Sequence, residues 1–153
     1  MTDAPHETCD PDLTIAGLSI WVWESVSRGD NFWDANWLNS TIRVEAFGSN
    51  VEVKGTTIHL SDLLFLRSEI RKLAGHFPGS FTLNFSEPYL SLDFECDKLG
   101  HVNIVIRITP NCYEQKHEYR FAADQTCFGV VMDQLRRVIA KFPATGTLPQ
   151  QFR

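Results

Sequence analysis

Two cysteines and two histidines have types and spacings that could bind a metal ion. Cys96 and His101 are separated by four residues, and so are Cys112 and His117. Zinc accepts two thiolates and two imidazoles in a tetrahedron. Cys96, however, continues an apolar strand pattern and His101 follows a turn, whereas zinc sites of this kind usually present each pair on a tight knuckle. We therefore expect no metal site and no cofactor.

Catalytic residue types are present, but none of them forms a recognisable motif. A cysteine nucleophile would need a base beside its thiolate, and no local signature places a histidine next to a cysteine. Cys127, near the start of a predicted helix, is interpreted as a packing residue. Glu24, Asp30 and Asp34 lie close together in sequence, but solvated acids in a loop are the commoner explanation of such a group. We expect no catalytic residues and no enzyme, and keep a hydrolase with an unrecognised acidic site as an alternative.

Composition and charge limit the kinds of partner. The chain has 153 residues, 43% of them hydrophobic, and 14 Lys and Arg against 19 Asp and Glu give a net charge of -5. A negative protein is not attracted non-specifically to nucleic acid or to anionic membranes. The sequence shows no secretory signal pattern and no apolar run of ~18 residues. We therefore expect a cytoplasmic protein with reduced cysteines, no nucleic-acid partner and no membrane partner.

The elements that would position these residues are mostly β-strands. Apolar and polar residues alternate most clearly around Leu90, Leu92 and Phe94 and again over residues 101–108, with a turn between the two segments. Such period-two alternation is typical of strands with one buried face. The predicted strands cover residues 18–25, 41–47, 51–60, 80–85, 89–97, 101–108 and 117–123.

Two segments show helical spacing instead. The first covers residues 61–75, with Ser61 as its expected N-terminal cap and Gly75 at its end. The second covers residues 124–143, with Asp124 able to cap its first turn and Pro143 ending it. The order βββ-α-ββββ-α predicts an α+β fold, in which a curved antiparallel sheet of about seven strands carries two packed helices. We expect a flexible leader at residues 1–12, a single domain at 13–143 and a loose tail at 144–153.

All four tryptophans lie between Trp21 and Trp37, and two of them belong to the stretch FWDANWL. An indole is large and amphipathic, so such a cluster is either a core anchor or a binding patch. We interpret Trp33 and Trp37 as core anchors that plug the open end of the curved sheet. Asp34 and Asn36 would then satisfy backbone groups of the linking loop.

Three stretches together resemble the WapI-type immunity proteins of bacterial polymorphic toxin systems. They are FWDANWL, the segment FTLNFSEPYLSLDFECDKLGHVNIVI and the closing RFAADQTCFGVVMDQLRRVIAKFP. The resemblance runs from about Trp33 to Pro143. Its matching positions are Trp33, Asp34, Asn36, Trp37, Leu38, Glu87, Leu90, Leu92, Gly100, His101, Asp124, Gln125 and Thr126. Their chemistry indicates a scaffold role rather than partner contact.

The resemblance implies a small cytoplasmic protein that binds and neutralises a cognate toxin domain. We expect inhibition by occlusion, without catalysis, by a monomer or weak dimer. Alternation places Tyr89, Asp93 and Glu95 on the strand face opposite Leu90 and Leu92, where acidic groups around an aromatic centre would suit a basic partner. These three residues are the predicted partner-binding site. A small-ligand-binding or structural module without a toxin partner remains an alternative.

Overall fold

The computed structural model describes residues 9–153, and this part of the chain folds into eight strands and three α-helices. The first antiparallel sheet has the order β1 (Leu13–Ile15), β2 (Leu18–Val26), β3 (Trp37–Ala46) and β4 (Ser49–His59). The second has the order β5 (Gly79–Asn84), β6 (Leu90–Cys96), β7 (His101–Ile108) and β8 (His117–Asp124). The helices are α1 (Phe32–Ala35), α2 (Leu60–Gly75) and α3 (Thr126–Lys141), and a 3₁₀ turn, η1 (Gln150–Phe152), follows them.

The predicted α+β class is confirmed, with helices packed against antiparallel strands. The strands divide between two four-stranded sheets, however, instead of forming one curved sheet. Alternation identifies a strand and its buried face, but it does not specify which strands become neighbours. The sheets separate because α2 begins at Leu60, directly after β4, and carries the chain away from the first sheet before β5 begins.

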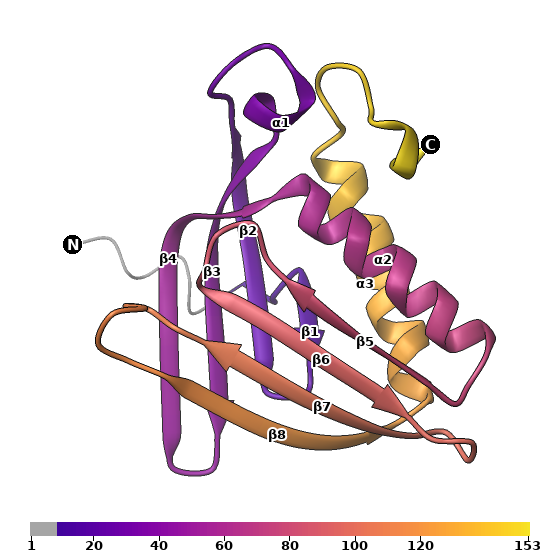
Figure 1. Ribbon diagram of the computed structural model, residues 1–153. Coiled ribbons are helices and arrows are strands. Elements are labelled where there is room, and N and C mark those ends of the chain that lie inside the picture. The colour runs from indigo at the N-terminus through magenta and orange to yellow at the C-terminus, as the bar shows by residue number, and fades with distance from the viewer. Residues whose placement is uncertain (1–8) are drawn as a thin grey trace.

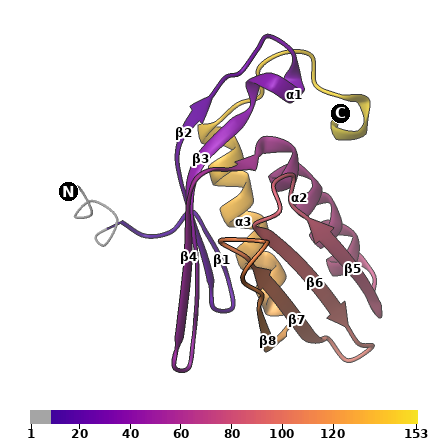
Figure 2. The same ribbon diagram turned by 60° about the vertical axis from the view of Figure 1, so that its left-hand side comes forward.

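One main core joins the two sheets to α2 and α3. Figures 1 and 2 show the two helices side by side and the second sheet running obliquely across the first. The predicted apolar faces of both helices and of the β6–β7 hairpin are buried, which confirms the periodicities in the sequence. Members of this core include Leu66, Ile70, Leu92, Phe94, Ile104, Ile106, Val131 and Leu135.

Parts of both terminal segments outside the predicted domain contact the folded body of the protein. Residues 1–8 of the expected leader lie outside the described residues, but Asp12 is bonded to β2, through its backbone N–H to Ile20 and its carboxylate to Val22. The expected tail packs against the body of the protein. Leu148 and Phe152 contact a small second core formed by Phe32, Leu60 and Leu64. This core lies beside α1, near the C-terminal end of the chain (Figure 1).

Candidate functional site

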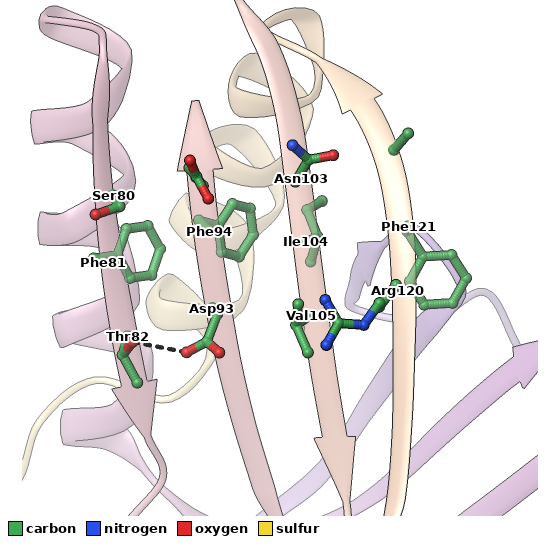
Figure 3. Close-up of a pocket in the computed structure, with 12 residues that line it drawn as sticks. Ser80, Phe81, Thr82, Asp93, Phe94, Asn103, Ile104, Val105, Arg120 and Phe121 are labelled. Atoms are coloured by element: carbon green, nitrogen blue, oxygen red, sulfur yellow. Dashed lines mark hydrogen bonds between the residues drawn. The ribbon is translucent and has the colours of Figure 1, made fainter. Parts of the chain in front are cut away.

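The outer face of the second sheet is the surface on which the predicted acidic residues lie. Strand register aligns Thr82, Asp93, Val105 and Arg120 in one row across β5–β8. Figure 3 shows this row from outside, with the helices behind the sheet. The adjacent row contains Glu95 beside Asn103, and both rows line a shallow hollow of about 650 Å³. The structure therefore places Asp93 and Glu95 on one uncovered face.

Asp93 belongs to a network of charges that crosses this face. Its carboxylate accepts a hydrogen bond from the Thr82 hydroxyl at 2.7 Å and pairs with Arg107 at 2.6 Å. These two contacts hold the pKa of Asp93 below its ordinary value. Arg107 also pairs with Glu118 at 3.0 Å, and Glu118 pairs with Arg120 at 3.2 Å. Asp93 is thus ionised, but Arg107 largely balances its negative charge. Glu95 is the more exposed of the two acidic side chains.

Tyr89 is not part of this charged face. It precedes the first residue of β6, is half-buried and packs against the main core. Its backbone carbonyl accepts a hydrogen bond from Thr109 at 2.9 Å. Tyr89, the aromatic residue that strand alternation predicts beside Asp93 and Glu95, is therefore not among the residues that line the hollow. Alternation fails at this position because the regular pleat begins only at Leu90.

A second arrangement is built from the tryptophan motif around His59. This side chain is only 1% exposed. The Trp33 ring stacks on it at 5.6 Å between centroids, and the rings of Trp37 and Phe32 meet it edge-on at 4.9 and 5.4 Å. Trp33 itself is 47% exposed, so its predicted role as a core anchor is wrong. Trp37 is half-buried and also carries the guanidinium of Arg28 over its ring.

His59 is the residue that caps α2, in place of the expected Ser61. Its Nδ1 accepts the Ser61 backbone N–H at 3.0 Å, which leaves Nε2 to donate to the Trp33 carbonyl at 3.1 Å. Burial lowers the pKa of His59, in keeping with a neutral ring. The backbone N–H of His59 in turn donates to Asp62 at 2.9 Å, which completes a capping box.

Asp62 connects this helix start to the second sheet. Its other carboxylate oxygen accepts hydrogen bonds from the backbone N–H and the hydroxyl of Ser86, at 3.0 and 2.9 Å. Burial raises the pKa of Asp62 to about 6 despite these bonds. Sequence reasoning missed both His59 and Asp62. The signal that could have found Asp62 is its position three residues after the cap, where acids recur in capping boxes.

The remaining motif residues have structural contacts that fit the predicted scaffold role. Asn36 donates to the carbonyls of Phe32 and Thr145 at 2.7 and 2.9 Å and accepts from the Thr145 N–H at 2.8 Å. Asp34 accepts a hydrogen bond from the side chain of Asn31, the residue that caps α1. Asn36 therefore fastens the C-terminal segment to the tryptophan motif.

The motif residues at the start of α3 are held in a similar way. The N-cap of α3 is Gln125, whose side chain makes no capping hydrogen bond, so the predicted cap at Asp124 is wrong. The carboxylate of Asp124 instead accepts the backbone N–H of Thr126 at 2.8 Å and holds the turn that leads into the helix. Gly100 has φ +86°, and a Cβ at this position would lie 1.9 Å from Oε1 of Gln125. Only glycine fits there without displacing Gln125, whose N–H donates to the Gly100 carbonyl at 2.9 Å.

The candidate metal ligands are not brought together. Cys96 is buried at the end of β6. Cys112 lies in the loop before β8, and His117 is the first residue of β8. Both lie at the opposite end of the β7–β8 pair from His101. Among residues 9–153, no three His, Cys, Asp or Glu side chains are placed to share a metal ion. Burial raises the pKa of the Cys127 thiol, which fits a packing residue. None of the helices in this range is long and apolar enough to span a bilayer.

A crystal structure of WHY1 from Arabidopsis thaliana is similar, with a TM-score of 0.40 and 11% identity, over 82% of this chain and 77% of that one. The search of curated proteins gave no match. Residues 12–143 match the immunity protein WapI-like family. This range contains both sheets and the helices α1, α2 and α3. The chain belongs to the immunity protein WapI-like family.

Proposed function

We propose that this protein binds a cognate toxin domain of a polymorphic toxin system and neutralises it by occlusion, without catalysing a reaction. It acts in the cytoplasm as a monomer or weak dimer. Family membership supports an immunity role and a toxin protein as partner. The net charge of -5 supports a partner with a basic surface, because opposite charges accelerate association.

The observation that carries the proposal is the uncovered outer face of β5–β8. Thr82, Glu95, Asn103 and Arg120 on this face are exposed. A sheet face of this kind can bury about 800 Å² against a partner, the area typical of a stable inhibitor complex. Glu95 offers an exposed negative charge, and Asp93 is fixed in position by Thr82 and Arg107. A basic toxin surface could pair with Glu95 directly and would compete with Arg107 for the Asp93 carboxylate.

The experiment is a charge reversal with a matched control. Asp93→Lys with Glu95→Lys changes the net charge by +4, and so does Glu69→Lys with Asp133→Lys on the helices. We expect the cognate toxin domain to be encoded beside this gene. If the outer face steers association, the first variant binds that domain at least about tenfold more slowly at low salt, and the difference shrinks as salt rises. The second variant shows only the smaller effect of net charge.

Two outcomes would remove this face from the proposal. One is an unchanged association rate for the Asp93 and Glu95 variant, and the other is an equal slowing in both variants. Because Asp93→Lys places a third cation near Arg107 and Arg120, thermal unfolding must be measured in parallel. The milder pair Asp93→Asn with Glu95→Gln gives a second measurement if the reversal unfolds the sheet.

A further inference from the structure

Phe47, at the tip of the β3–β4 hairpin, has no contacts that the fold requires. Its side chain is 109% exposed, which is at least as open to water as in an unfolded chain. The tip consists of residues 46–49, where Ala46 and Ser49 are the last paired residues of the hairpin. Figures 1 and 2 show this hairpin reaching the end of the molecule opposite α1. The fold therefore does not explain an apolar aromatic residue at this position.

The hairpin tip is nevertheless hydrogen-bonded to neighbouring segments on both sides. The hydroxyls of Ser49 and Tyr119 are hydrogen-bonded at 2.5 Å, which ties the tip to β8. On the other side the N–H of Glu45 donates to the carbonyl of Gly17 at 2.9 Å. A Cβ at Gly17 would lie 2.3 Å from the Glu45 carbonyl oxygen, so glycine is what allows the β1–β2 turn to approach so closely. The backbone beneath Phe47 is therefore ordered before a partner binds, which lowers the entropic cost of association.

The charges near the tip are paired with one another. Arg43 contacts Glu52 at 2.7 Å and Glu45 at 3.8 Å, and Lys54 contacts Glu52 at 3.3 Å. The surroundings of Phe47 thus offer a partner an apolar ring and no strong excess of either charge. Such a group suits an apolar pocket rather than a charged surface.

We propose that Phe47 is an anchor that enters an apolar pocket in a concave surface of the toxin domain. This inference rests on the proposed function and names the contact that slows dissociation of the complex. A rigid hairpin with one projecting aromatic residue fits a cleft, and filling a cleft is a direct means of occlusion. The outer face of β5–β8 then accelerates the encounter, while Phe47 holds the complex after it forms.

The other exposed aromatic side chains of the described residues have different settings. Trp33 and Phe65 both lie against Phe152, so their partial exposure belongs to the packing of the C-terminal segment. Tyr113 is 94% exposed, but it lies in the loop between β7 and β8 and carries a hydroxyl that water can solvate. Tyr113 is therefore a matched control, because it is an equally open aromatic residue without a braced hairpin beneath it.

The test is the dissociation rate of the complex with the toxin domain encoded beside this gene. Phe47→Ala is expected to dissociate about 30-fold faster or more, as expected for an aromatic anchor that contributes at least ~2 kcal/mol. This factor should be the same at low and high salt, because the contact is apolar. Phe47→Leu should recover part of the loss, and Tyr113→Ala should dissociate as the parent does.

Phe47 has no fold contacts to lose, so the variant should unfold at the parent's temperature and inhibition should weaken without loss of structure. A Phe47→Ala complex that dissociates at the parental rate overturns the inference while the proposed function stands. An equal effect of Tyr113→Ala also overturns it, because the contact would then not be specific to the hairpin tip. Failure of the parent protein to bind the toxin domain overturns both the inference and the proposed function.

Discussion

Replacement of His59 by alanine tests whether the tryptophan motif supports the fold through this one buried ring. His59 caps α2 through Nδ1, donates from Nε2 to the Trp33 carbonyl and fills the space between Phe32, Trp33 and Trp37. Alanine at this position removes all three interactions. Because the side chain is 1% exposed, water cannot readily replace them.

The expected loss of unfolding free energy is the sum of three contributions: the lost helix cap, the unpaired carbonyl and the cavity. A missing N-cap costs about 1 kcal/mol. A carbonyl that loses its donor in a partly buried position costs about 1–2 kcal/mol. A residual cavity of ~60 Å³ costs about 1.4 kcal/mol at ~24 cal/mol per Å³. The sum is about 4 kcal/mol, which corresponds to a fall in melting temperature of roughly 10 °C for a chain of this length.

The assay is urea unfolding at pH 7.5, with two further variants for comparison. His59→Asn keeps a capping oxygen but cannot reproduce the ring contacts, so its loss should be intermediate. His101→Ala removes an exposed ring at the start of β7 and should leave the unfolding midpoint where it is. A loss below about 1 kcal/mol for His59→Ala, or an equal loss for His101→Ala, would refute the assigned role of His59.

Two other predictions concern the same end of the protein. Burial raises the pKa of Asp62 from 3.8 to about 6, so the folded state binds a proton more tightly than the unfolded state, and this group adds stability as pH falls from 7 to 4. The free energy of unfolding of the parent and of Asp62→Asn should be measured across that range, and the difference between the two should change by up to about 3 kcal/mol. Free energies of unfolding that vary with pH in the same way in both proteins would contradict the prediction. Asn36→Ala should release the C-terminal segment, seen as faster proteolysis after residue 144; unchanged cleavage would mean that the bonds to Thr145 do not hold it.

The secondary structure was largely visible in the sequence because burial on one face produces a regular pattern. The predicted strand at residues 101–108 coincides with β7, and both long helices end within two residues of their predicted limits. β1 and α1 have only three and four residues, too few for a period to appear. The division into two sheets depends on strand neighbours, which alternation does not encode.

The candidate site was predictable only where it depends on one strand. Alternation correctly placed Asp93 and Glu95 on the outer face, but the pairing of Asp93 with Arg107 depends on the register between β6 and β7. The hydrogen bond of His59 Nε2 to the Trp33 carbonyl joins segments that lie 26 residues apart. The packing of the tail depends on Asn36, 109 residues from Thr145. Contacts between such distant segments leave no local pattern.

The most direct test of the central claim is protection of a living cell. The toxin domain encoded beside this gene is expressed in a bacterial host with or without this protein, and survival is counted while the two purified proteins are tested for a complex. We predict that cells making both proteins survive and that the pair forms a stable 1:1 complex. Growth arrest in the presence of folded protein, or purified partners that do not bind, would contradict the account.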